Sequence, residues 1–184
     1  IKKQFEQLHI ELGGASDDEQ GNKKLHGGPE MAIHQYSQES YEALKDQFPS
    51  IAHNLIFGSI GENISAPTMN DENVFIGDTY RIGGVVLQVN SPRAPCSKIN
   101  QRYGVKNMDL FIAEKGITGW YYRVIETGIV HVGDHIILEH RLQKTTSIRN
   151  IMRLTRSKDK NIPLRLEAAS INGLAAEWVR KLRK

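Results

Sequence analysis

Residues 73–92 read NVFIGDTYRIGGVVLQVNSP, and this stretch predicts the fold class. Short runs rich in β-branched and aromatic residues are separated at Gly77-Asp78 and at Gly83-Gly84. Glycine-containing pairs of this kind favour tight turns between strands. The stretch therefore predicts strand, turn, strand, turn, strand.

The same pattern returns in residues 120–141, WYYRVIETGIVHVGDHIILEHR, where we expect turns at Thr127-Gly128 and Gly133-Asp134. Short strands joined by close turns are typical of closed or nearly closed β-barrels, whereas βαβ units alternate strands with helices. The sequence thus predicts a mainly β protein of the α+β class, built on a barrel.

Helical patterns flank these strands. In residues 36–49, YSQESYEALKDQFP, Ser37 can cap a helix that Pro49 follows. After Arg141, residues 145–156 predict a helix capped by Thr146 or Ser147, and residues 161–184 predict two more helices. The helices are therefore expected on both sides of the strand-rich region in the sequence.

Charge is distributed unevenly along the 184 residues, whose formal net charge is +3. Residues 1–140 carry 12 Lys and Arg against 18 Asp and Glu, a net charge of −6, whereas residues 141–184 carry 12 against 3, a net charge of +9. Such a split suggests two units, with an acidic partner for the second. We predict a barrel domain over residues 1–145 and a basic helical extension over residues 146–184.

The composition argues against several classes of protein. One cysteine cannot form an internal disulfide, and no run of about 18 consecutive apolar residues is present. Neither an oxidising compartment nor a transmembrane helix is therefore indicated. Because no signal-peptide pattern appears either, we expect a cytoplasmic location without membrane association.

That single cysteine, Cys96, stands in residues 89–100, VNSPRAPCSKIN. A lone cysteine is often a small buried apolar residue. Here, however, the neighbouring prolines cannot continue a strand ladder, so the chain is expected to leave the sheet, and loops leaving strands commonly carry sites. Arg93 and Lys98 are cationic and would favour the thiolate. Both interpretations remain open, with Cys96 as a candidate metal ligand or nucleophile.

Two glycine-containing loops are further candidates for a binding site. In residues 23–32, KKLHGGPEMA, the glycines allow close approach of a ligand, and Lys24 and His26 offer groups for an anion. A tight turn with solvated lysines explains the same pattern. His26 and His34 do not have the spacing of a common zinc motif.

The second loop is residues 58–65, GSIGENIS, where Asn63 follows Gly61 and Glu62. An asparagine side chain has both a donor and an acceptor, so Asn63 could contact the polar edge of a ligand. An Asx turn is an equally good explanation.

Taken together, four fragments resemble the MOSC domain, the family named after the C-terminal domain of molybdenum cofactor sulfurases. They are DEQGNKKLHGGPEMAIHQY, FPSIAHNLIFGSIGENIS, NVFIGDTYRIGGVVLQVNSPRAPCSKIN and GWYYRVIETGIVHVGDHIIL. The similarity covers roughly residues 10–140 and is greatest to the stand-alone, YiiM-like branch. It implies a barrel of the pyruvate-kinase type, and the basic tail resembles the three-helix extension of that branch.

This resemblance also implies an activity. MOSC proteins are associated with molybdenum cofactor, a pterin dithiolene with a phosphate, and related members reduce hydroxylamino-purines and amidoximes, which is a detoxifying reaction. The family cysteine falls on Cys96, as a thiolate ligand to molybdenum. Two family motifs fall on Lys24, His26, Gly27 and Gly28 and on Gly61, Glu62 and Asn63. We expect Lys24, His26, Gly27, Gly28 and Asn63, together with the cationic Arg93 and Lys98, to contact the cofactor.

Three functions therefore compete. The first is a reductase of small N-hydroxylated compounds that receives electrons from a flavin-bearing partner protein, since no GxGxxG motif indicates a flavin or nicotinamide of its own. The second is a carrier that holds a persulfide on Cys96. The third, a nucleic-acid binder using the basic tail, ranks last, because the tail has a single aromatic residue, Trp178, on its apolar face.

Overall fold

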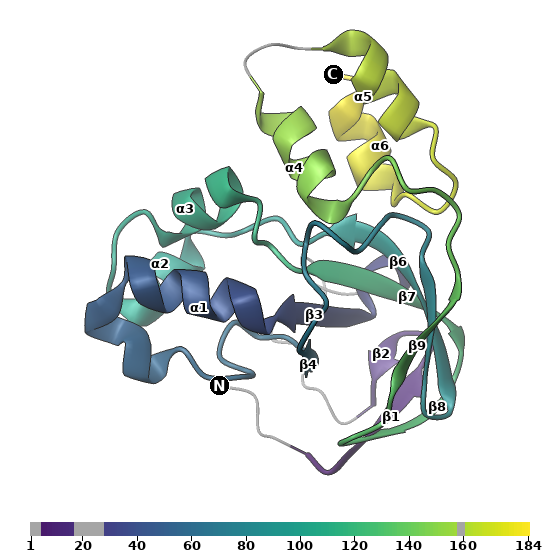
Figure 1. Ribbon diagram of the computed structural model, residues 1–184, viewed down its shortest axis with the longest axis horizontal. Helices are drawn as coiled ribbons and strands as arrows, with labels where there is room; N and C mark the ends of the chain where they lie inside the picture. Colours follow the sequence, from purple (N-terminus) through teal and green to yellow (C-terminus); the bar gives the residue numbers. More distant parts are fainter. Residues whose placement is uncertain (1–4, 17–27, 158–160) are drawn as a thin grey trace.

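The computed structural model describes residues 5–16, 28–157 and 161–184. Within this part of the chain, strands form two sheets beside several helices (Figure 1). The stretch 79–92 folds as predicted into an antiparallel pair, β5 (Thr79–Ile82) and β6 (Val85–Pro92), with Gly83 and Gly84 in the turn.

The first expected strand of this stretch does not form. Phe75 makes a single bridge to Ser147 in place of a strand ladder. Val74 and Ile76, on either side of this bridge, are buried and hydrogen-bond through their backbones to Ile148 and Thr146. The buried carboxylate of Asp78 accepts hydrogen bonds from the Phe75 N–H at 3.1 Å and from the Tyr80 hydroxyl at 3.0 Å.

The second strand-rich stretch forms β7 (Trp120–Glu126), β8 (Gly128–His131) and β9 (Ile136–His140). The turn at Gly133-Asp134 is confirmed, since the Asp134 N–H donates to the His131 carbonyl at 3.1 Å. At Thr127-Gly128, where a turn was expected, β7 and β8 do not pair with each other, and β8 pairs with β1 instead. The chain changes sheets there, where a Cβ on Gly128 would lie 2.4 Å from the Gly84 carbonyl oxygen.

The larger sheet has six strands in the order β4-β3-β7-β6-β5-β9, with β3 at Ile33–Ser37 and β4 at Ile64–Ala66. Its β3–β4 pair is parallel and the other pairs are antiparallel. A three-stranded sheet, β2-β1-β8, stands beside it, with β1 at Gln7–Glu11 and β2 at Gly14–Ala15. The six-stranded sheet is curled into a half-barrel, and the pyruvate-kinase type of barrel stays a prediction.

One group of helices covers the face of β3 that carries Tyr36. It comprises α1 (Gln38–Gln47), η2 (Pro49–Asn54), α2 (Lys98–Tyr103) and α3 (Met108–Lys115), on the left of Figure 1. The predicted cap of α1 is confirmed, because the Ser37 side chain accepts a hydrogen bond from the Ser40 N–H at 3.0 Å. Tyr36 packs in one cluster with apolar residues of these helices, among them Leu44 and Met108.

The tail forms α4 (Ile148–Arg156), α5 (Ile162–Ala169) and α6 (Ala176–Leu182), which stand above the sheet in Figure 1. Ser147 caps α4, as one of the two predicted caps. The buried side chains of these helices share one cluster with sheet residues such as Leu87 and Val89. The division of the chain near residue 145 stays a prediction. Within the described residues, no helix is both long and apolar enough to span a membrane.

Candidate functional site

Two predicted site residues, Asn63 and Arg93, lie next to the ends of one row of paired residues in the six-stranded sheet. Ile64, Gln35, Trp120 and Pro92 are successive partners across β4, β3, β7 and β6. Asn63 directly precedes β4, and Arg93 directly follows β6, where its N–H donates to the Gly119 carbonyl at 3.1 Å. Residues that lie 30 positions apart in the sequence therefore lie within a few strands of each other.

Asn63 is fastened to β3 by two hydrogen bonds. Its backbone N–H donates to the His34 carbonyl at 2.8 Å, and its side-chain Oδ1 accepts from the His34 N–H at 3.0 Å. The Asn63 side chain thus accepts a backbone N–H of another strand, and not a nearby N–H as in an Asx turn. Part of the acceptor capacity that the sequence suggested for a ligand is therefore used by the fold.

The neighbouring Glu62 is buried and organises the whole loop. Its Oε1 accepts hydrogen bonds from the Tyr41 hydroxyl at 2.6 Å, the Gly58 N–H at 2.7 Å and the Ser65 hydroxyl at 2.9 Å. Burial, and then the charge of Glu62, raise the pKa of Tyr41 above its ordinary value. Glu62 thus ties α1 to the loop that presents Asn63, a positioning role that its place in the sequence did not reveal.

Tyr36 lies on the face of β3 that α1 covers, where its ring meets that of Tyr41. It is fully buried, and its hydroxyl donates to the Ile117 carbonyl at 2.9 Å. Burial raises the pKa of Tyr36 well above its ordinary value, the charges of Asp71 and Tyr41 raise it further, and Arg93 lowers it.

Asp71 is a buried acid that the sequence analysis did not identify. Its Oδ1 accepts hydrogen bonds from the N–H groups of Thr118 and Gly119, both at 2.9 Å. Burial raises the pKa of Asp71 to about 6, although these hydrogen bonds act in the opposite direction. Asp71 thus holds Thr118 and Gly119, which precede β7, and the Arg93 N–H donates to the Gly119 carbonyl. Since its partners lie 47 positions away, no local sequence pattern could indicate this role.

Cys96 lies between β6 and α2 and is half-buried, so it is not sealed in the core. Its carbonyl accepts from the Ile99 N–H at 3.0 Å, which leads the chain into α2. Lys98, the first residue of α2, is exposed. Within the described residues, no group of three or more His, Cys, Asp or Glu side chains could hold a metal ion. A single accessible thiolate nevertheless fits a metal whose other ligands belong to its own cofactor.

The glycine loop is described in part. Lys24, His26 and Gly27 lie outside the described residues, so their predicted roles stay predictions. Gly28 has a φ of +97°, and a Cβ there would meet nothing within 4 Å, which leaves its backbone open to close approach. Gly28 leads into η1 (Pro29–Met31), whose Glu30 carbonyl accepts from Asn90 at 2.8 Å. Gly28 therefore adjoins the start of β3, whereas Arg93 lies at the level of its far end.

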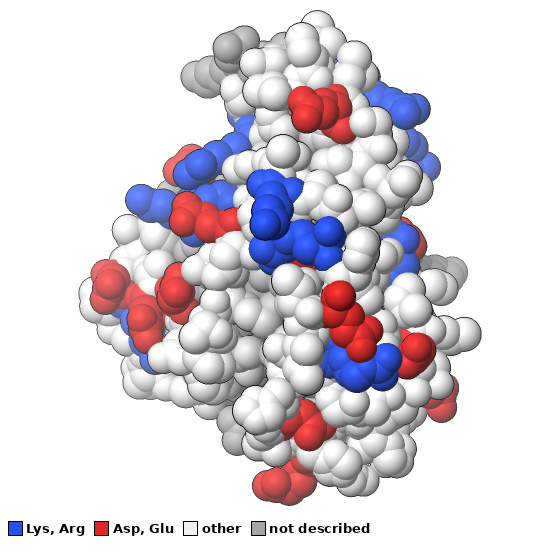
Figure 2. Space-filling view, turned by 45° about the vertical axis from the view of Figure 1, so that its right-hand side comes forward, with Lys and Arg blue, Asp and Glu red and all other residues white. Residues whose placement is uncertain are grey.

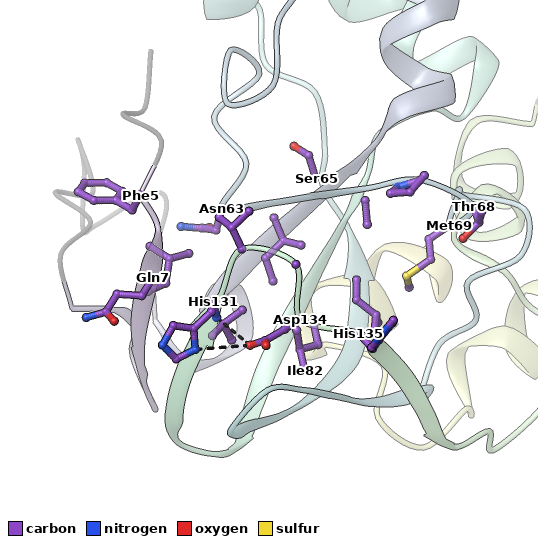
Figure 3. Close-up of a pocket in the computed structure, with 18 residues that line it drawn as sticks. Phe5, Gln7, Asn63, Ser65, Thr68, Met69, Ile82, His131, Asp134 and His135 are labelled. Atoms are coloured by element: carbon purple, nitrogen blue, oxygen red, sulfur yellow. Dashed lines mark hydrogen bonds and ion pairs between the residues drawn. The ribbon is translucent and has the colours of Figure 1, made fainter.

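A pocket of about 500 Å³ lies between the start of β1, the segment 63–69 and the β8–β9 turn (Figure 3). Asn63 is among its lining residues and Cys96 is not. The predicted cavity shared by the Asn63 loop, the Cys96 segment and the Lys24–Gly28 loop therefore stays a prediction.

Comparison with known proteins gives a consistent assignment. Residues 22–137 match the family model of the MOSC domain. Protein YiiM of Escherichia coli (strain K12) is 35% identical over 133 residues, which cover 72% of this chain and 59% of YiiM. A protein of Gibberella moniliformis named "Reductase" is 35% identical over 147 residues, which cover 79% of this chain and 26% of that protein. The chain thus spans only part of these relatives.

Solved structures agree with this assignment. The crystal structure of YiiM from Escherichia coli matches with a TM-score of 0.86 at 25% identity, covering 96% of this chain and 83% of the other. A second crystal structure, of a protein described as hypothetical, matches with a TM-score of 0.88 at 28% identity, covering 96% and 80% of the two chains. The arrangement of sheets and helices is therefore shared over nearly the whole chain.

Proposed function

Because this chain belongs to the MOSC domain family, we propose that it binds molybdenum cofactor and reduces small N-hydroxylated compounds such as hydroxylamino-purines and amidoximes. The observation that carries the proposal is the half-buried Cys96 on the segment that leaves β6, three residues after Arg93. The similarity to a protein named "Reductase" supports the class of reaction.

In this proposal each part of the chain has a defined role. Cys96 binds the metal as a thiolate, and Arg93 and Lys98 are the cationic residues that flank it in the sequence. The pterin and its phosphate are held by Lys24, His26, Gly27 and Gly28, with Asn63 contacting a polar edge. When bound, the cofactor supplies the two-electron chemistry that breaks the N–O bond, with two protons taken up and one water released.

The electrons come from a flavin-bearing partner protein that docks on the basic tail. In Figure 2, basic side chains are frequent around the upper lobe formed by α4–α6, and acidic ones are more frequent below it. The positive charge available for docking is smaller than the net charge of +9 that residues 141–184 carry. Arg165 is buried and donates to the Leu182 and Lys181 carbonyls, and Arg141 pairs with the buried Asp78 at 2.7 Å. Docking therefore relies on exposed residues such as Arg180 and Arg183.

A persulfide carrier is the second candidate, because a half-buried thiol also suits sulfur transfer. Metal and pterin analysis of the protein, purified from a host that makes molybdenum cofactor, separates the two. About one molybdenum and one pterin per chain is the expected result for a reductase of this type. Labile sulfur on Cys96 without molybdenum would support the carrier and contradict the proposal.

A further inference from the structure

The pocket in Figure 3 lies where the two edges of the curled sheet face each other. Ile64 and Asn63 come from the β4 edge, while Ile136 comes from β9, the opposite edge strand. Ile82 and Val130 add to the apolar part of its wall. The pocket therefore occupies the open seam of the half-barrel.

This seam belongs to a different face of the sheet from the Cys96 segment. Gln35 points to the pocket side, since its Nε2 lies 3.5 Å from the sulfur of Met69, a lining residue. Side chains alternate along a strand, so the next residue, Tyr36, points to the opposite face and packs beside α1. The segment that carries Cys96 leads into α2, whose Ile99 packs in the same cluster as Tyr36 on that opposite face. The pocket thus lies on the other face from the Cys96 segment, and Asn63 is the one proposed cofactor contact among its described lining residues.

The polar groups of the pocket define its ligand. Among the described lining residues, Asp134 is the one Asp or Glu, and none is Lys or Arg. Asp134 is held in place because its Oδ2 accepts the His131 N–H at 2.7 Å and lies 3.8 Å from His131 Nδ1. His131 and His135 also line the pocket. A carboxylate in a partly apolar pocket favours a positively charged planar group and disfavours a phosphate.

We propose that this pocket is a second binding site, for a small aromatic cation of the amidine or aminated-heterocycle class. Asp134 pairs with the cationic N–H groups, and Ile64, Ile82 and Met69 contact the ring. The volume of about 500 Å³ accommodates a ligand of one or two rings. The site does not depend on molybdenum cofactor, so it can be tested on the protein without cofactor.

Two probes of matched shape and opposite charge test the site: benzamidine, a cation, and benzoate, an anion. We expect benzamidine to bind with a Kd of about 1 mM or tighter, and benzoate at least tenfold more weakly, by calorimetry. In ¹⁵N-labelled protein, benzamidine should shift the backbone signals of Met69 and Asp134 and leave that of Cys96 unchanged. Equal binding of the two probes, or shifts confined to the Cys96 segment, would overturn the proposal.

Variants add a second test. Asp134→Asn keeps an acceptor for the His131 N–H and should weaken benzamidine binding about tenfold, since it removes one charge-assisted hydrogen bond. Glu139→Gln is the matched control, because Glu139 pairs with Arg81 outside the pocket. Val132→Lys changes a pocket residue that is 74% exposed, so it leaves the fold intact and should reverse the preference toward benzoate. Unchanged affinities in both pocket variants would show that the pocket does not recognise cations.

Discussion

The half-buried position of Cys96 leads to the most direct residue-scale prediction. Cys96→Ser should abolish reduction of an N-hydroxylated substrate, because a neutral hydroxyl is a hard and poor ligand where a soft thiolate is needed. Serine is nearly the same size, so the unfolding midpoint should stay close to that of the unchanged protein. Substrate turnover and bound molybdenum are the two measurements. Normal turnover by the serine variant would show that Cys96 is packing alone.

A second residue-scale prediction concerns the buried Asp71. Its pKa is raised from 3.8 to about 6, mainly by burial. The unfolded chain therefore releases this proton near pH 4, while the folded chain keeps it until about pH 6. The contribution of Asp71 to the free energy of unfolding is then largest below about pH 4. It falls by about 3 kcal/mol as pH rises from about 4 to about 6.

Asp71→Asn provides the control for this effect. The amide keeps an oxygen for the Thr118 and Gly119 N–H groups but does not titrate. The difference in unfolding free energy between the two proteins should therefore change by about 3 kcal/mol across this pH window, while other titrating groups cancel. A difference that is independent of pH would mean that the hydrogen bonds to Asp71 cancel the effect of burial on its pKa, and the prediction would be wrong.

At the scale of elements, Gly119 directly precedes β7 and lies close to the backbone of β3. Its φ is +67°, and a Cβ there would lie 2.4 Å from the Gln35 carbonyl oxygen and 2.9 Å from His34 Nε2. Gly119→Ala should therefore lower the free energy of unfolding by about 3 kcal/mol, measured by chemical denaturation, because the strands must separate or shift.

Gly104 offers a matched comparison for that variant. It has a φ of +65°, and a Cβ there would meet nothing within 4 Å. Gly104→Ala should cost only the backbone strain, about 1 kcal/mol. Equal losses in the two variants would show that backbone conformation, and not the approach of β3 to β7, determines the requirement for glycine at Gly119.

The whole-molecule prediction concerns the distribution of charge. Replacing Arg180, Lys181 and Arg183 with Glu should slow turnover driven by the donor protein severalfold at low salt, because electrostatic attraction raises the association rate. The effect should shrink at physiological ionic strength, where the Debye length is about 8 Å. Turnover with a small chemical reductant should stay the same, since the Cys96 segment is unchanged.

A control variant carries the same charge change elsewhere. Lys45, Lys106 and Lys115 are exposed on or beside the helices that cover the other face of the sheet. Reversing these three to Glu should leave donor-driven turnover close to that of the unchanged protein. If both triple variants slow turnover equally, net charge matters and the tail is not the docking surface.

Local features of the fold could be predicted from the sequence alone. The turn at Gly83-Gly84 and the helix starts at Ser37 and Ser147 depend on residues a few positions apart, so their chemistry is visible in a short window. The family assignment also came from ordered motifs, and the match over residues 22–137 confirms it. Of the predicted site, Cys96 is half-buried, and its role as a ligand stays a prediction.

Tertiary structure decided the features that depend on residues far apart in the sequence. Val74–Ile76 has the composition of a strand, but it makes a single bridge to Ser147, and β8 pairs with β1, about 120 positions earlier. Arg165 looks like surface charge, yet it is buried because its guanidinium binds the carbonyls at the end of α6. Each outcome depends on a buried polar group finding its partner or on two backbones meeting, and only the folded chain determines which groups meet.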